Sequence, residues 1–88
     1  MISKEVVIQN ELGLHARAAS LFVQLSSKYK ADVFLQKDEK RINGKSIMGI
    51  MMLAAAKGTT LIISAEGEDA EIMVEKLNEL IENKFGEE

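Results

Sequence analysis

The spacing of hydrophobic residues changes several times along the chain, and each change marks a boundary between predicted elements. Alternating or β-branched stretches predict strands at residues 2–8, 32–36 and 60–66. A polar turn at 37–40 is followed by a short return strand at 41–43, which predicts a hairpin with the strand before it.

Three helices are predicted between and after these strands. Helical spacing over residues 16–28 places one set of side chains on a common face, consisting of Ala18, Leu21, Phe22, Leu25 and Tyr29. Ser46 is suited to cap a second, short helix that runs to about Leu53. The apolar side of this helix is expected to consist of Ile47, Ile50 and Met51. The longest helix is expected over residues 69–84, with acidic residues at its start and Gly86 after its end.

The elements therefore follow the order β-α-β-β-α-β-α, which predicts an α+β fold. Strands joined by helices on this scale favour a four-stranded, mainly antiparallel sheet with the helices on one face. No internal repeat, linker or low-complexity segment divides residues 1–88, so we expect a single domain.

Composition narrows the classes of function. The hydrophobic fraction of 47% is typical of a globular protein. No apolar run approaches the roughly 20 residues of a membrane span, and the N-terminus lacks the layout of a signal peptide. We therefore expect a cytoplasmic protein without membrane insertion. The net charge of −3 argues against a protein that binds nucleic acid by neutralising phosphates.

The segment from Gly13 to Ser20 holds the residues best suited to chemistry. It places His15, the chain's one histidine, where a loop becomes a helix, and the free backbone N–H groups of a first helical turn bind anions. Arg17 adds a guanidinium that can bind phosphate oxygens. Imidazole can form covalent intermediates, and phosphoryl transfer needs positioning and charge stabilisation more than acid–base groups. The spacing alone does not decide for such a site. It is explained equally well if His15 merely caps the helix and Arg17 is a solvated surface residue.

A second segment, Asn43 to Ile50, contains Gly-Lys-Ser before the predicted short helix. This is similar to the end of a nucleotide-binding P-loop, but the full pattern requires glycine at position 39, where the chain has Glu39. The P-loop interpretation is therefore rejected. Ser46 remains as a helix cap, followed by a cluster of Ile47, Met48 and Met51. These three side chains either pack into the core or form an exposed surface that adapts to several partners.

At these two segments the sequence resembles the HPr family, the histidine-containing phosphocarriers of the bacterial phosphoenolpyruvate:sugar phosphotransferase system. Residues 13–17, Gly-Leu-His-Ala-Arg, are similar to the family's phosphorylation motif. Residues 45–51, Lys-Ser-Ile-Met-Gly-Ile-Met, are similar to the regulatory-serine motif of its Gram-positive-type members. The order of elements agrees over essentially the whole chain. The resemblance implies an open-faced β-sandwich with strand order 1-4-2-3 and three helices on one side.

The resemblance also implies roles for single residues. His15 would accept phosphate at Nδ1 from the phosphoenolpyruvate-dependent Enzyme I and donate it to the IIA domains of sugar permeases, with Arg17 as the phosphate-binding residue. Ser46 resembles the target of an ATP-dependent HPr kinase/phosphorylase, and its phosphorylated form would bind a catabolite-control transcription regulator. The residues that resemble the family's apolar docking patch are Ile47, Met48 and Met51. We expect a monomeric carrier that forms a phosphohistidine rather than a stand-alone enzyme, with no metal and no cofactor.

The chain departs from the family at two places. It has Ala18 where the family usually has proline, and Ala54 and Ala55 where the family often has glycine. Two alternative functions remain open. One is a carrier in a nitrogen-related phosphotransfer chain, against which the motif around Ser46 favours the sugar branch. The other is a small RNA-binding α+β module, which needs aromatic residues on the sheet, and Phe34 is the single candidate.

Strand alternation also predicts the composition of the open face of the sheet. It turns Phe34 and Ile62 away from the helices. In the 1-4-2-3 order their strands are neighbours, so the two residues are candidates for a cross-strand aromatic–aliphatic pair. Together with Val7 they would alternatively form a weak self-association surface.

Overall fold

The computed structural model describes residues 1–87, and its elements follow the predicted order. The strands are β1 (Ile2–Val7), β2 (Asp32–Lys37), β3 (Lys40–Asn43) and β4 (Thr60–Glu66). The helices are α1 (Ala16–Ser26), α2 (Ile47–Leu53) and α3 (Ala70–Glu82), followed by a 3-10 turn, η1 (Lys84–Gly86).

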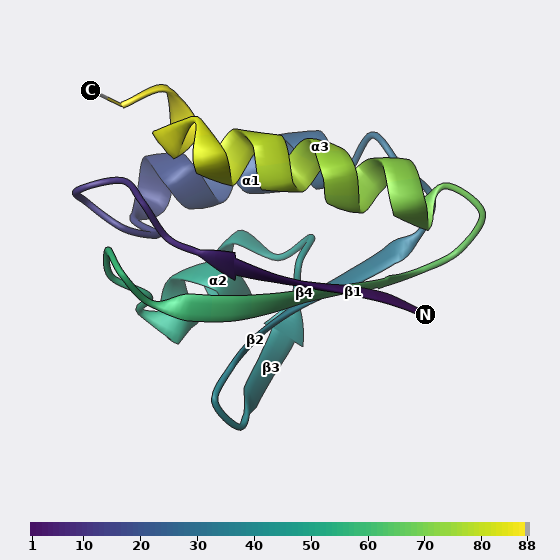
Figure 1. Ribbon diagram of the computed structural model, residues 1–88, viewed down its shortest axis with the longest axis horizontal. Helices are drawn as coiled ribbons and strands as arrows, with labels where there is room; N and C mark the ends of the chain where they lie inside the picture. Colours follow the sequence, from purple (N-terminus) through teal and green to yellow (C-terminus); the bar gives the residue numbers. More distant parts are fainter. Residues whose placement is uncertain (88) are drawn as a thin grey trace.

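All strand pairs are antiparallel, and the strands lie in the order β1-β4-β2-β3. Helices α1 and α3 cover one face of this sheet, and the opposite face is open (Figure 1). Helix α2 packs against α1 and against the hairpin of β2 and β3. The predicted open-faced β-sandwich with strand order 1-4-2-3 is therefore confirmed.

The core lies between the sheet and the two long helices. Alternate residues of the central strands are buried, among them Leu35 on β2 and Ile63 on β4, while Phe22 on α1 and Leu77 on α3 meet them from the helices. A one-residue slip of a strand would turn its buried side chains to the open face, so burial pins the register of the sheet. The loops at the ends of the strands are consequently held at fixed positions.

The buried face of α1 differs from the predicted one. Ala19 and Ser26 are buried, whereas Leu25 is half-buried at the edge of the core. The hydroxyl of Ser26 donates a 3.0 Å hydrogen bond to the carbonyl of Gly44, in the loop before α2. This bond satisfies a polar group inside the core, and a pattern of apolar residues cannot reveal it.

Helix α3 ends at Glu82, earlier than the predicted limit at residue 84. The next residues leave the helix because Lys84, Phe85 and Gly86 have positive φ values of 58°, 54° and 78°. The ring of Phe85 is buried at 5% exposure, which anchors this reversal of the chain. The C-terminal residues are thereby brought to the end of the molecule where the loop before α1 lies (Figure 1).

Phe34 and Ile62 lie on the open face, as strand alternation predicts, but diagonally rather than directly opposite each other. Phe34 pairs with Ser64 across the β2–β4 ladder, and Ile62 pairs with Gln36. The guanidinium of Arg41 lies 4.2 Å from the centre of the Phe34 ring, in a cation–π contact. The proposed self-association surface would therefore carry a cation over its aromatic member.

Candidate functional site

His15 occupies the N-cap position of α1. Its backbone is extended, with φ −78° and ψ −178°, and its carbonyl accepts a 2.9 Å hydrogen bond from the N–H of Ala19. The imidazole makes no capping hydrogen bond to the first turn of the helix. His15 therefore occupies the cap position, but its ring takes no part in capping and is available for other contacts.

The loop before His15 is packed against the segment that follows α2. The N–H of Leu14 donates a 2.9 Å hydrogen bond to the carbonyl of Ala55. At Gly13, whose φ is +65°, a β-carbon would lie 2.4 Å from the same carbonyl oxygen. Only glycine fits this conformation and this close approach. The backbone on the N-terminal side of His15 is thus fixed by contacts from a different part of the chain.

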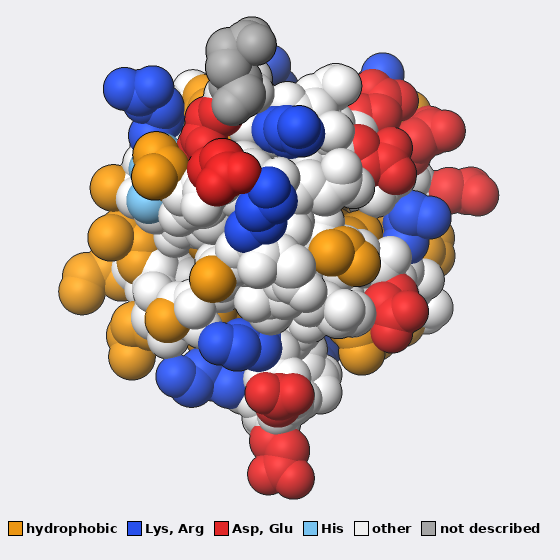
Figure 2. Space-filling view, turned by 60° about the vertical axis from the view of Figure 1, so that its left-hand side comes forward, with side chains coloured by type: hydrophobic (Ala, Val, Ile, Leu, Met, Phe, Trp, Pro, Cys, Tyr) orange, Lys and Arg blue, Asp and Glu red, His pale blue; other side chains and the backbone are white. Residues whose placement is uncertain are grey.

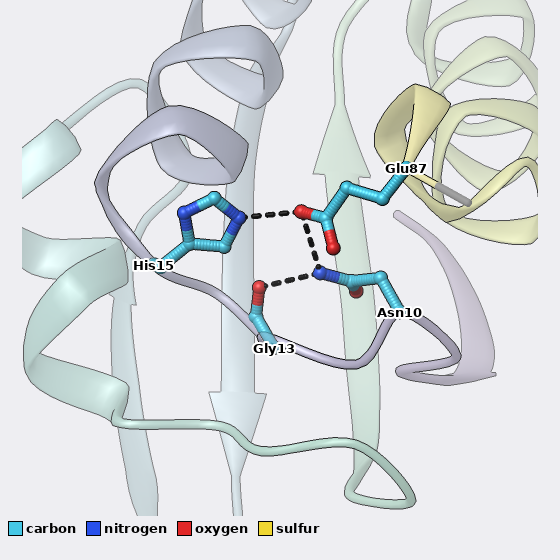
Figure 3. Close-up of polar contacts among 4 residues, drawn as sticks. All are labelled: Asn10, Gly13, His15 and Glu87. Carbon is cyan, nitrogen blue, oxygen red and sulfur yellow. Dashed lines mark hydrogen bonds and ion pairs between the residues drawn. The ribbon is translucent and has the colours of Figure 1, made fainter.

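Asn10 holds the same loop from inside. Its side chain is fully buried, and its amide nitrogen donates hydrogen bonds to the carbonyl of Gly13 at 2.7 Å and to the carboxylate of Glu87 at 3.2 Å (Figure 3). The side-chain oxygen of Asn10 has no hydrogen-bond partner among residues 1–87. Asn10 therefore joins the loop before α1 to the C-terminal turn of the chain.

The carboxylate of Glu87 contacts the imidazole itself. Its Oε2 lies 2.5 Å from Nε2 of His15 (Figure 3), and the two side chains are 15% and 26% exposed. The hydrogen bond from His15 holds the pKa of the Glu87 carboxyl below its ordinary value, against the opposing effect of desolvation, and the hydrogen bond from Asn10 adds to the lowering. Sequence analysis missed Glu87, which lies 72 positions from His15 and outside every motif.

The other ring nitrogen, Nδ1, points away from Glu87 (Figure 3) and has no hydrogen-bond partner within residues 1–87. The first-turn amides of α1 that follow it have no acceptor within the helix. The guanidinium of Arg17 is exposed and makes no ion pair or hydrogen bond to any residue that the structure describes. A nucleophilic nitrogen, free backbone donors and an uncommitted cation are therefore grouped at one helix start, an arrangement suited to a phosphoryl group.

Most apolar side chains of α2 face solvent. Ile50 and Leu53 are the buried residues of this helix, so of the two alternatives left open for Ile47, Met48 and Met51 the structure shows the exposed surface. The exposed residues of α2, here called the α2 surface, are Ile47, Met48, Met51 and Met52. Figure 2 shows hydrophobic side chains gathered beside the pale-blue imidazole. Sequence analysis did not single out two further exposed apolar side chains, namely Met52 on α2 and Leu12 in the loop before His15.

Ser46 caps α2 as predicted. Its Oγ accepts a 3.0 Å hydrogen bond from the N–H of Gly49, and its own N–H donates to the carbonyl of Asn43 at 3.1 Å. Its side chain is half-buried beside the α2 surface. A group added to this hydroxyl would therefore stand next to those apolar side chains.

The C-terminal end of α2 is stabilised by two lysines of the β2–β3 hairpin. Lys37 Nζ donates to the carbonyl of Leu53 at 3.2 Å, and Lys40 Nζ donates to that of Met52 at 3.1 Å. Both cations meet carbonyls that have no partner within the helix, where positive charge is favourable. The α2 surface is therefore presented on a helix that is held at both ends.

Residues 1–87 form neither a metal-binding cluster nor a membrane-spanning helix. This part of the chain brings together no three His, Cys, Asp or Glu side chains that could hold a metal ion. None of its helices is both long and apolar enough to cross a lipid bilayer.

Comparison with known proteins decides the family. A family model described as the PTS HPr component phosphorylation site matches residues 2–83. The chain belongs to the HPr family. It is thus a phosphocarrier of the phosphotransferase system, as its two sequence motifs indicate.

The chain is similar to HPr proteins over its full length. It is 47% identical over 87 residues to phosphocarrier protein HPr of Neisseria meningitidis, which covers 99% of this chain and 98% of that protein. A crystal structure of HPr-C-His from Thermoanaerobacter tengcongensis superposes with a TM-score of 0.96 at 49% identity, covering 100% and 99% of the two chains. Crh of Bacillus subtilis, described as a catabolite repression protein and a domain-swapped dimer, matches with a TM-score of 0.77 at 43% identity, covering 96% and 97%.

Proposed function

We propose that this HPr-family chain accepts a phosphoryl group from phosphorylated Enzyme I on Nδ1 of His15 and donates it to the IIA domains of sugar permeases. The observation that carries the proposal is Nδ1 of His15 at the start of α1, which has no hydrogen-bond partner within residues 1–87, as is also true of the Arg17 guanidinium two positions further along. The carrier would work in the cytoplasm, and its partners would supply the remaining parts of each active site.

Each transfer is a displacement at phosphorus. The lone pair of Nδ1 attacks the phosphorus, the bond between phosphorus and the donor breaks, and its electron pair leaves with the donor. Arg17 and the first-turn amides bind the phosphoryl oxygens and reduce the cost of their negative charge. The same steps in reverse order deliver the group to a IIA domain. No proton has to be removed from the reacting nitrogen, provided that the ring hydrogen resides on Nε2.

The α2 surface is the proposed docking site for these partners, with Ile47, Met48 and Met51 as its main contacts. Methionine suits a surface that must fit several proteins because its side chain is flexible and polarisable. Their exposure supports this role, as do the hydrophobic side chains that Figure 2 shows beside the imidazole.

Ser46 is the proposed regulatory site, phosphorylated by an HPr kinase/phosphorylase. A phosphate there would carry about two negative charges beside apolar side chains that a partner must desolvate. We infer that this lowers docking of Enzyme I and creates the surface that a catabolite-control transcription regulator reads. The likeness to Crh, described as a catabolite repression protein, supports a regulatory role.

The proposed working form is a monomer, because docking requires an uncovered α2 surface. The dimer described for Crh belongs to that protein. Sedimentation of this chain at working concentration tests the point, and a stable dimer that carries phosphate as fast as the monomer would contradict it.

The central test is transfer of label from phosphoenolpyruvate. Wild-type chain, Enzyme I and phosphoenolpyruvate labelled in its phosphoryl group should give one labelled nitrogen per chain, and adding a IIA domain should remove the label. A reaction without Enzyme I is the control for direct labelling. His15→Ala should take up no label while keeping its fold, and label retained by that variant would overturn the proposal.

A further inference from the structure

The last described residues, Lys84 to Glu87, form a turn that reverses the chain, here called the C-terminal turn. Lys84 and Phe85 adopt left-handed backbone conformations, which non-glycine residues rarely do. Such conformations persist when the surrounding structure determines them, and they are concentrated at functional sites. Here the buried ring of Phe85 holds the turn in place, and Glu87 follows directly. The family model matches residues 2–83, so this turn follows the matched part of the chain.

The C-terminal turn places the side chain of Glu87 at the site, where two residues contact its carboxylate. Oε2 of Glu87 is 2.5 Å from Nε2 of His15 and 3.2 Å from the amide nitrogen of Asn10. Asn10 is fully buried and also binds the carbonyl of Gly13, two residues before the histidine. The carboxylate is therefore positioned by the same network that positions the loop carrying His15 (Figure 3).

We propose that Glu87 is a positioning residue that fixes the tautomer and the orientation of the His15 ring for phosphoryl uptake. An ionised carboxylate only accepts hydrogen bonds, so the ring nitrogen facing it must carry the hydrogen. In the neutral imidazole the hydrogen then resides on Nε2 and the lone pair on Nδ1, the nitrogen that has no partner among residues 1–87. This inference rests on the proposed role of His15 as phosphoryl acceptor and extends it to a residue of the C-terminal turn.

The charge of Glu87 has a second consequence for the same step. When Nδ1 bonds to phosphorus while Nε2 keeps its hydrogen, the ring gains positive charge. A carboxylate at hydrogen-bond distance from Nε2 stabilises that charge as it develops, much as carboxylates bonded to a histidine ring nitrogen do in other sites. The carboxylate thus favours the phosphorylated ring over the free one.

The test uses two variants and a matched control. Glu87→Ala removes the acceptor, and Glu87→Gln offers both a donor and an acceptor, so it no longer dictates which ring nitrogen carries the hydrogen. Glu82→Ala removes the same charge from an exposed position at the end of α3 and serves as the control. Backbone amide spectra of all variants report whether the fold is retained.

The first readout is the pair of imidazole 15N chemical shifts of the free protein in mildly alkaline solution. Wild type and Glu82→Ala should show the hydrogen on Nε2, whereas both Glu87 variants should show a mixture of tautomers. This measurement needs no Enzyme I, so it remains informative if the proposed phosphocarrier function fails. A wild-type ring with its hydrogen on Nδ1 would overturn the inference, as would unchanged shifts in Glu87→Ala.

The second readout is the rate of phosphorylation by Enzyme I. Glu87→Ala should lower kcat roughly ten-fold, the lower end of the loss found when the carboxylate that orients a metal-bound histidine is removed. KM should change little because Glu87 is not part of the α2 surface. A change confined to KM, or a rate equal to that of Glu82→Ala, would overturn the positioning role.

Discussion

The carboxylate of Asp69 accepts a 2.8 Å hydrogen bond from the backbone N–H of Ala31, which joins the start of α3 to the beginning of β2. Its second oxygen accepts a hydrogen bond from the N–H of Lys30 at 2.9 Å. One side chain thus fixes the segment between α1 and β2 and satisfies two of its backbone donors. The hydrogen bond from Lys30 is the main reason why the pKa of Asp69 lies below its ordinary value, and the bond from Ala31 lowers it further. Desolvation opposes both effects.

This lowered pKa predicts a dependence of stability on pH. Because the pKa is lower in the folded than in the unfolded chain, the contribution of Asp69 is fully present above its ordinary pKa. It is lost as the pH falls through the lowered folded value. Urea unfolding of wild type and Asp69→Asn over a series of pH values should show a difference at neutral pH that shrinks in acid. A difference that stays constant with pH would contradict the assignment.

A second prediction concerns Ala54, which ends α2 in a left-handed conformation with φ 52° and ψ 42°. This left-handed conformation destabilises the folded state by about 1–2 kcal/mol when the residue is alanine. Glycine avoids that strain, but it lowers the free energy of unfolding by about 0.4–1 kcal/mol because the unfolded chain becomes more flexible. Ala54→Gly should therefore raise the free energy of unfolding by about 0.5 kcal/mol or more. Ala56→Gly, at an exposed position without a positive φ, should lower it. Equal effects at both positions would show that the left-handed conformation is not the cause.

A third prediction separates backbone strain from steric conflict in the loop before His15. Gly13 and Gly58 both have positive φ, but a β-carbon at Gly13 meets the Ala55 carbonyl, whereas one at Gly58 has nothing within 4 Å. Gly13→Ala should destabilise the protein by about 2 kcal/mol or more, and Gly58→Ala should cost about 1 kcal/mol or less. Chemical denaturation measures both. Similar costs would mean that the loop can move away from Ala55.

The elements, their order and the two faces of the sheet were predictable because each depends on local spacing. A period near two or near 3.6 is visible within a single segment, and the cap at Ser46 needs only the residues that follow it. Family resemblance then supplied the strand order, which the antiparallel ladders confirm.

The contacts that complete the site were not predictable in the same way. Glu87 reaches His15 only because three successive residues turn the chain with positive φ, and two of them are not glycine. Which methionines of α2 face solvent depends on where α1 and the hairpin pack, since a helix apolar on most sides gives no clear inner face. Long-range packing decides both features, and no local pattern encodes it.

A fourth prediction tests how Arg17 acts. Losing a charge-assisted hydrogen bond to a phosphoryl group costs about 1.5–3 kcal/mol, so Arg17→Ala should slow phosphate uptake at His15 roughly ten- to hundred-fold. Arg17→Lys should fall between, because lysine keeps the charge but lacks the planar pair of donors. Since Arg17 is exposed and unpaired within residues 1–87, neither variant should alter thermal stability appreciably. Single-turnover phosphorylation by Enzyme I gives the rates, and an Arg17→Ala variant as fast as wild type would exclude a phosphate contact.

The last prediction separates two functions of Ser46 that one substitution alone would confuse. Its Oγ caps α2 through the N–H of Gly49, and its position beside the α2 surface makes it the proposed regulatory site. Ser46→Ala removes the cap and should lower the free energy of unfolding by about 1 kcal/mol, yet it adds no charge and should leave phosphorylation of His15 unchanged. Ser46→Asp keeps an acceptor for the Gly49 N–H and places negative charge at a helix start, where it is favourable, so stability should be retained.

The same aspartate adds a charge beside Ile47 and Met48, which a docking partner must desolvate. Ser46→Asp should therefore raise KM for phosphorylation by Enzyme I several-fold while kcat changes little, because the imidazole and Arg17 are untouched. The two variants are therefore affected in different assays. Ser46→Ala should be the less stable of the two, and Ser46→Asp should be the weaker in docking. A steady-state analysis with Enzyme I and a thermal melt of the same samples measure both properties. If the aspartate variant docked as well as wild type, charge at position 46 would not act through the α2 surface.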